Sequence, residues 1–213
     1  MQAPFSQPAC KIEDYALIGD CETAALVGRN GSIDWLCWPR FDSGACFAAL
    51  LGTPDNGLWR IAPVAENARV SRRYRPNTLI LETEFATPEG EAVLIDFMPL
   101  REHASHVMRL VVGKRGSIRM RSELIIRFDY GASVPWVRRT DNGDLLAISG
   151  PDMLVLRTPV GGHVCRRRRF GGSFAACISG TCGRSPAGRG ALSTSTASWR
   201  TTRSDSPPHP RRG

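Results

Sequence analysis

Three aspartates, Asp20, Asp34 and Asp42, lie within a short segment near the N-terminus. A protonated and an ionised carboxyl group can cleave a glycosidic bond by acid–base catalysis when about 6.5–9.5 Å separate them. The segment is therefore the first candidate for a catalytic site. The alternatives are structural: an aspartate near a glycine often caps a turn, and Asp34 could be solvated or paired with Arg29.

An aromatic and charged group follows directly, in the order Trp38, Arg40, Phe41 and Asp42. Flat rings stack on the apolar faces of sugars, and charged side chains fix sugar hydroxyls. Three roles remain open for these residues: a surface that meets another domain, direct contact with a sugar, or folding alone. Trp35, just before them, is expected in the core because its face of the segment is apolar.

Two strands must position these side chains. The dipeptide Asn30-Gly31 predicts a type I′ hairpin turn, because both residues tolerate positive φ. Such a turn pairs Leu26 with Trp35 and Ala25 with Leu36. The second strand should end at Pro39, which has no amide hydrogen to donate, so the residues after it form a loop.

Short apolar or alternating segments, separated by turn residues, continue to residue 158. The expected strands are 58–63, 69–75, 78–87, 91–98, 106–112, 117–128, 135–139, 145–149 and 153–158. Residues 46–51 are expected to form a helical turn, and Gly113–Gly116 a turn between strands. Many short strands without a long helical pattern predict an all-β fold, an antiparallel β-sandwich.

Several motifs in the same order resemble one known family. The run GDCETAALVGRNGSIDWLCWPRFDS, preceded by IEDYALI, closely resembles the opening of the bacterial and archaeal family 15 glycoside hydrolases, which include glucoamylase-like and trehalase-like enzymes. YRPNTLILETEF and VLIDFMP resemble later parts of the same N-terminal domain. The resemblance covers about residues 12–159. It implies a β-sandwich of the super-sandwich type, followed in the family by a linker and an α-helical toroid.

The resemblance also carries functional expectations. The acid and base glutamates of the family belong to the toroid, so no catalytic residue is expected in this chain. The implied partner is the catalytic α-helical domain, absent from this chain, and the implied substrate of the parent enzyme is an α-glucoside: trehalose, a maltooligosaccharide or starch. The chain alone should then be inactive. The alternative is a freestanding carbohydrate-binding or protein-interaction module.

Composition divides the chain into a flexible lead at 1–11, a domain at 12–160 and a basic tail at 161–213. The tail contains ten arginines and a single acid, Asp205, whereas the domain is close to neutral despite the overall charge of +8. No nucleic-acid partner is therefore expected for the folded domain. The tail is either a natural disordered segment or the product of translation out of frame; we favour the second interpretation.

Other chemistries find little support in the sequence. His103 and His106 are spaced like metal ligands on a helix, but no cysteine or acid completes a tetrahedral set, so no metal is expected. No motif predicts a bound cofactor. Without an apolar run of about 18 residues or a signal peptide, we expect no membrane segment and a cytoplasmic location.

Two further groups of side chains are expected to be structural. Cys21, Cys37 and Cys46 lie in or beside apolar segments, where cysteines are more often inert than nucleophilic. The second group, Arg72, Arg73 and Arg75, should form a solvated basic face.

Overall fold

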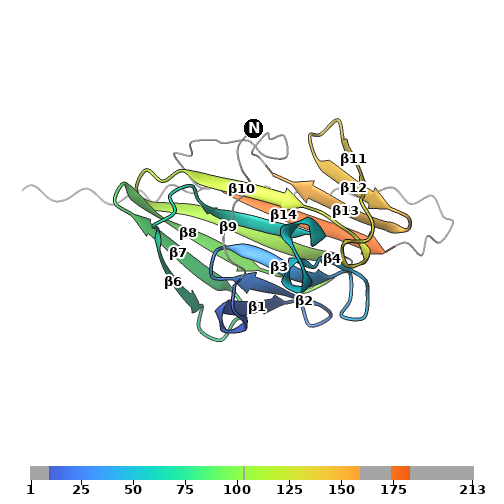
Figure 1. Ribbon diagram of the computed structural model, residues 1–213, viewed down its shortest axis with the longest axis horizontal. Coiled ribbons are helices and arrows are strands. Elements are labelled where there is room, and N and C mark those ends of the chain that lie inside the picture. The colour runs from blue at the N-terminus through green and yellow to red at the C-terminus, as the bar shows by residue number, and fades with distance from the viewer. Residues whose placement is uncertain (1–9, 103, 159–173, 183–213) are drawn as a thin grey trace, which may run out of the picture.

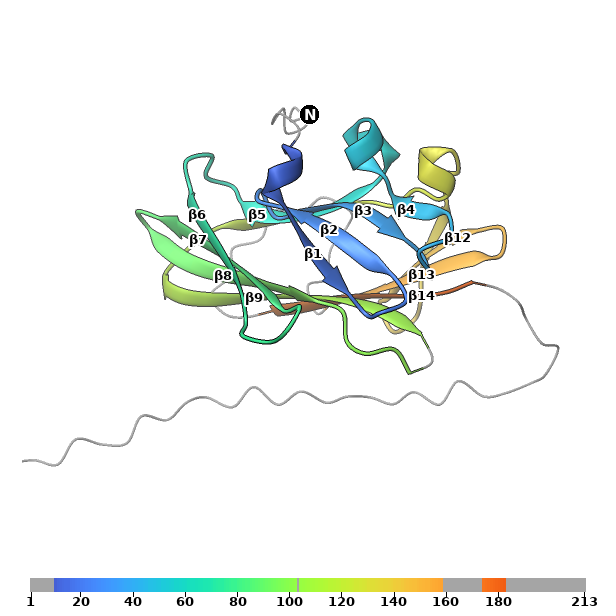
Figure 2. The same cartoon turned by 90° about the horizontal axis from the view of Figure 1, so that it is seen from below.

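The computed structural model describes residues 10–102, 104–158 and 174–182 (Figure 1). These residues form two antiparallel sheets that lie face to face, as the view in Figure 2 shows. Within the described ranges the helical segments are all short 3-10 turns. The predicted all-β antiparallel sandwich is confirmed, and none of these helical turns is long and apolar enough to cross a membrane.

The first sheet has the strand order β1-β2-β3-β5-β10, with β4 paired to β3. Its strands are β1 (Tyr15–Gly19), β2 (Ala24–Gly28), β3 (Ser32–Cys37), β4 (Ala45–Phe47), β5 (Leu58–Pro63) and β10 (Met120–Ile125). Among the described residues, the 3-10 turn η1 (Ile12–Asp14) precedes β1. The 3-10 turns η2 (Ala49–Leu51), η3 (Pro54–Asn56) and η4 (Asp129–Gly131) lie in connections between strands. The hairpin that carries the candidate residues therefore supplies two neighbouring strands of this sheet, β2 and β3.

The second sheet has the order β11-β12-β13-β14-β9-β8-β7-β6. Its strands are β6 (Arg69–Tyr74), β7 (Leu81–Thr87), β8 (Gly90–Phe97), β9 (Ser105–Gly116), β11 (Trp136–Arg139), β12 (Leu145–Ser149), β13 (Asp152–Arg157) and β14 (Phe174–Cys182). All strand pairs are antiparallel.

The core lies between the two sheets and follows from the alternation of side chains along each strand. In β7, Leu81 and Phe85 are buried while Glu82 and Glu84 point outward, as expected when successive side chains face opposite sides of a sheet. The fully buried side chains come from both sheets, for example Ile18, Val27, Leu36, Leu81, Leu94, Val107 and Leu154. One continuous core therefore holds the two layers together.

The first hairpin forms with the predicted pairs Ala25–Leu36 and Leu26–Trp35, but the predicted turn type is wrong. Only the glycine of the Asn30-Gly31 pair has a positive φ, +76°. The Gly31 amide donates to the Gly28 carbonyl at 2.9 Å, and a bulge lets Val27 pair with Ile33. This is the longer hairpin with a glycine bulge. Residue 31 has to be glycine because a Cβ at this position would lie only 2.2 Å from the carbonyl oxygen of Ile61.

Two further local predictions are corrected. Residues 46–51 do not form a helical turn throughout, because Ala45–Phe47 pairs with β3 as strand β4 before the 3-10 turn η2 begins. The predicted turn at Gly113–Gly116 is absent. Strand β9 continues through it, since β8 offers hydrogen-bonding partners as far as the Gly90–Gly116 pair.

Strand β14 lies inside the predicted tail. It pairs with β13 on one side and β9 on the other, in the interior of the second sheet. The predicted end of the strands near residue 160 is therefore wrong for residues 174–182, which complete the hydrogen bonding of two neighbouring strands. The remainder of the predicted tail and residues 1–9 of the predicted lead lie outside the described residues, and translation out of frame stays a prediction.

Candidate functional site

The loop from Trp38 to Ser43 separates the predicted site residues into two environments. Trp38 is only 5% exposed and belongs to the core, where its Nε1 has no hydrogen-bond partner among the described residues. Arg40 and Asp42 form an exposed ion pair, with 3.1 Å between Nε and Oδ1, and Phe41 is 63% exposed. The structure therefore brings Arg40, Phe41 and Asp42 together at the surface and assigns Trp38 to packing.

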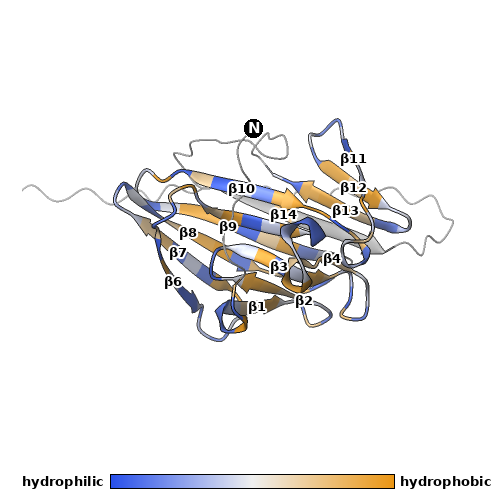
Figure 3. Ribbon diagram, in the orientation of Figure 1, coloured by the Kyte–Doolittle hydropathy of each residue, from blue (hydrophilic) through white to orange (hydrophobic). Residues whose placement is uncertain are grey.

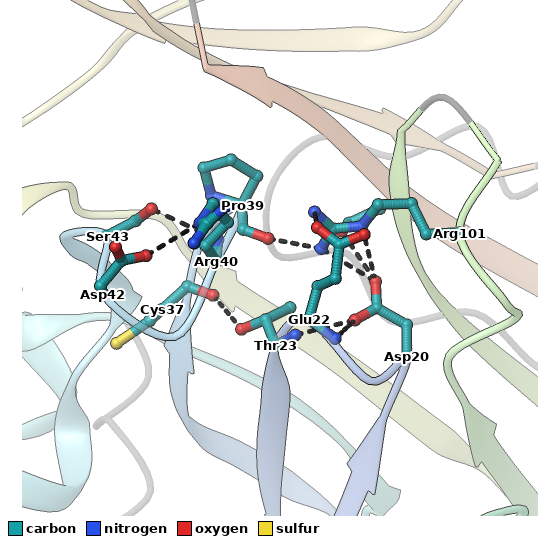
Figure 4. A network of polar contacts seen from close by, with 10 residues as sticks. Asp20, Glu22, Thr23, Cys37, Pro39, Arg40, Asp42, Ser43 and Arg101 are labelled. Atoms are coloured by element: carbon teal, nitrogen blue, oxygen red, sulfur yellow. Dashed lines mark hydrogen bonds and ion pairs between the residues drawn. The ribbon is translucent and has the colours of Figure 1, made fainter.

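Arg101 holds this loop in place, although the sequence did not single it out (Figure 4). Its Nε and Nη2 bind Oδ2 of Asp20 at 3.1 and 3.0 Å, and its Nη1 binds Oε2 of Glu22 at 2.9 Å. Nη2 also donates to the carbonyl oxygen of Pro39. The turn between β1 and β2 is thereby fixed to the start of the loop by a side chain that is 13% exposed.

Asp20 is the buried centre of the same network. It accepts hydrogen bonds from the amides of Thr23 and Glu22 at 2.8 and 3.0 Å and from the Ser105 hydroxyl at 2.8 Å. Burial alone would raise the pKa of Asp20, but these hydrogen bonds and the Arg101 guanidinium hold the pKa below its ordinary value. Asp20 is thus an ionised anchor.

Backbone contacts anchor the loop further. The Phe41 amide donates to the carbonyl of Glu22 at 3.0 Å, and the Thr23 hydroxyl donates to the carbonyl of Cys37 at 2.7 Å. The loop is therefore held on both sides of Pro39, and Phe41 is exposed on a fixed backbone.

Asp34 belongs to a separate cluster. It accepts hydrogen bonds from the Tyr15 hydroxyl at 2.7 Å and from the Ser32 hydroxyl, and it is 8% exposed. Burial and the neighbouring Asp34 carboxylate raise the pKa of Tyr15. Both alternatives considered for Asp34, solvation and pairing with Arg29, are wrong: Arg29 pairs with Asp14 instead, at 3.2 Å.

The three aspartates do not provide an acid–base pair. A general acid in a glycosidase requires a raised pKa, whereas hydrogen bonding to Arg40 lowers the pKa of Asp42, and the pKa of Asp20 is also lowered. The carboxylates of Asp20 and Asp34 are buried and occupied by structural partners. Each of the three therefore has a local structural explanation.

Other predicted groups have structural neighbours. No group of three or more His, Cys, Asp or Glu within the described ranges could hold a metal ion. His103 lies outside those ranges. Nδ1 of His106 lies 3.9 Å from Sγ of Cys177. Burial lowers the pKa of His106 and raises the pKa of the Cys177 thiol to about 11.

The predicted basic face on β6 is also corrected. Arg72 points to the inner side of the strand, where its Nη1 donates to the carbonyl of Val27 at 3.1 Å. Arg73 and Arg75 point outward, and both bind Glu82, at 2.8 and 2.7 Å. They form ion pairs with this one carboxylate on the exposed side of the strand.

Residues 4–167 of the chain match the family described as trehalase-like, N-terminal. The chain belongs to this family. The trehalase-like N-terminal domain had been indicated by the first hairpin and the later strand motifs, and the matched range includes strands β1 to β13. No solved structure matched the chain.

Named relatives agree with this assignment. The chain is 42% identical over 134 residues to Trehalase 1 of Sulfolobus acidocaldarius, a match that covers 62% of this chain and 22% of the relative. It is 36% identical over 120 residues to a trehalase of Mycobacterium tuberculosis, covering 56% and 16%, and 33% identical over 140 residues to a trehalase of Thermoplasma volcanium, covering 62% and 22%. The chain thus spans less than a quarter of the length of each relative.

Proposed function

We propose that this trehalase-like N-terminal domain is the non-catalytic part of a glycoside hydrolase of family 15 that acts on α-glucosides. One observation carries the proposal: most of the chain matches the N-terminal domain of the family, yet it spans only about a fifth of the relatives named trehalases. The catalytic residues of the parent enzyme then belong to the part of the enzyme outside this domain. The names of the relatives favour trehalose over maltooligosaccharides as its substrate.

The geometry of the acids supports a non-catalytic role. Asp20 is bound by Arg101 and Ser105, and Asp34 by Tyr15, so neither carboxylate is available to a substrate without breaking the fold. Asp42 is accessible but lies beside Arg40 on an exposed loop, with a lowered pKa. Such carboxylates suit structural roles better than proton transfer to a leaving group.

The anchored loop is the proposed contribution of this domain to the parent enzyme. Arg40, Phe41 and Asp42 form an exposed tip on a backbone that Arg101 and Glu22 hold in place. Fixed loops with an exposed ring and charged neighbours are suited to contact another protein surface. The proposed partner is the catalytic part of the same enzyme, and Trp38 supports the loop from the core.

Activity measurements on the purified full chain test the proposal. With trehalose or maltooligosaccharides as substrate, glucose release should not exceed the rate without protein. Turnover at an enzyme-like rate that Asp34→Asn abolishes, in a variant with an unchanged thermal transition, would contradict the proposal. Binding of either sugar without turnover, measured by calorimetry and lost in Phe41→Ala, would instead support the freestanding carbohydrate-binding module.

A further inference from the structure

The outer faces of the two sheets have opposite character. The outer face of the second sheet carries ion pairs between neighbouring strands: Glu82 with Arg73 and Arg75, Glu84 with Lys114, and Glu91 with Arg115. Strand β6 is largely hydrophilic in Figure 3, whereas β2 is hydrophobic. A face covered by exposed ion pairs is suited to water, so the second sheet has an ordinary solvent-facing side.

The outer face of the first sheet carries an apolar row instead. Leu17 is paired with Leu26 across β1 and β2, and Leu26 with Trp35 across β2 and β3. All three point away from the core, because their neighbours Ile18, Ala25 and Leu36 are fully buried on the other side. The ring of Tyr130 lies 5.9 Å from that of Trp35. We name Leu17, Leu26, Trp35 and Tyr130 the outer apolar row.

The outer apolar row remains partly open to solvent. Leu17 is 43% exposed and Tyr130 is 45% exposed, while Trp35 is half-buried against the small side chains of Ala45 and Ala48. Along a strand of an antiparallel sheet with one face in water, the side chains on that face are normally polar. A continuous apolar row at these positions is typical of a surface that binds another protein.

Backbone strain beside the row points the same way. Asp129 and Tyr130 both have positive φ, +50° and +58°, a conformation that side-chain-bearing residues rarely adopt. The fold maintains this conformation where the Tyr130 ring meets Trp35. Strained residues are concentrated at functional surfaces, and tyrosine and tryptophan are enriched in protein interfaces.

We propose that the outer apolar row is the surface on which the remainder of a trehalase-length chain docks. The inference rests on the proposed function and names the interface. More than three quarters of each named relative lies outside the matched region, so a large partner is available within one chain. The exposed loop begins directly after β3, three residues after Trp35, so the same strand leads from the row to the loop tip.

The test uses the intact chain and a defined probe. The probe is Trehalase 1 of Sulfolobus acidocaldarius without its matched segment, used after it has shown a cooperative thermal transition. Binding is measured by sedimentation, and protection of side chains by hydroxyl-radical footprinting. We expect binding, with protection of Leu17, Trp35 and Tyr130. We also expect Leu17→Glu to weaken binding and to raise the dissociation constant roughly tenfold or more, as for a residue central to an interface.

Leu79→Glu is the matched control. Leu79 is 48% exposed, a fraction similar to the 43% of Leu17. It lies in the connection between β6 and β7, outside the outer apolar row. The control should bind like the unchanged chain. If Leu17→Glu does not fold, Tyr130→Ala replaces it, because Tyr130 lies in a 3-10 turn rather than in a strand.

The outcomes separate the two proposals. Binding that both glutamate variants leave unchanged, without protection of the row, would overturn the docking surface and leave the proposed function standing. Failure of the folded probe to bind at all would overturn the docking surface and the proposed catalytic partner, whereas the non-catalytic role is decided by the turnover measurement. A chain that forms dimers alone, and loses them in Leu17→Glu, would assign the row to a second copy and overturn this proposal.

Discussion

Single side chains explain how the first hairpin and its loop are fixed. The Asp20 carboxylate accepts hydrogen bonds from two backbone amides, a hydroxyl and a guanidinium. An acid that was a candidate catalytic group in the sequence therefore stabilises a turn. Arg101 makes its contribution from a position 81 residues away in the chain. A partner this distant leaves no local pattern in the sequence, which is why sequence analysis identified the acid but missed the arginine.

Acid should weaken the fold through Asp20. Because its folded pKa lies below the ordinary value of about 3.9, its stabilising contribution is present above that pH and is lost as the pH falls through the folded pKa. The free energy of unfolding, measured by urea titration from pH 6 to pH 3, should therefore fall. In Asp20→Asn the fall should be smaller; an equal fall in both proteins would assign the acid sensitivity to other carboxylates.

At the scale of elements, the outer edge of β1 is closed by a side chain of the opposite sheet. The Leu17 amide donates to the Tyr74 hydroxyl, which in turn donates to the Leu17 carbonyl, both at 2.8 Å. Strand β1 ends the first sheet and β6 ends the second. Tyr74 thus satisfies backbone groups that an open edge would offer to another chain.

Tyr74→Phe tests this closure. Loss of both hydrogen bonds should reduce the free energy of unfolding by about 1 kcal/mol. Hydrogen exchange of the Leu17 amide should become faster, since its acceptor is removed. The Leu26 amide, on the interior strand β2, is the internal control and should exchange at an unchanged rate. Equal acceleration at both amides would indicate general destabilisation rather than the opening of one edge.

The strands were predictable where alternation and turn residues coincide, as in Leu58–Pro63, which the structure reproduces to the residue. The glycines at 113 and 116 suggested a turn, but the extended edge of β8 keeps them in β9. It was harder still to predict which face of the first hairpin would be buried. Trp35 was expected in the core, but the opposite face of the hairpin, with Ala25 and Leu36, is the one that is buried. Trp38, for which three roles were left open, is buried on that side as well.

At the scale of the whole molecule, one buried arginine connects the two sheets. Arg109 on β9 binds Asp96 on β8, with 2.8 Å between Nε and Oδ1, and both side chains are fully buried. Its other nitrogens donate to the carbonyls of Gly31 and Trp59 in the first sheet. The guanidinium also lies 5.2 Å from the centre of the Trp59 ring. One cation therefore satisfies acceptors from both layers.

Arg109→Met should lower the free energy of unfolding by about 3–5 kcal/mol, because it leaves Asp96 charged and unpaired in the core. Arg115→Met on the same strand is the control. Its pair with Glu91 is exposed, and an exposed pair contributes at most about 1 kcal/mol. Urea denaturation at pH 7 measures both variants. Similar losses would show that the buried contacts of Arg109 are not a main source of stability.

The position of β14 has a consequence for shortened versions of the protein. A polypeptide that stopped at Arg157 would lack the strand between β9 and β13 and would present an unpaired edge on each. Open edges of this length recruit strands from other molecules. Any attempt to trim the chain to its most regular part would therefore favour intermolecular sheet formation, and solubility would depend on residues that composition alone assigns to a tail.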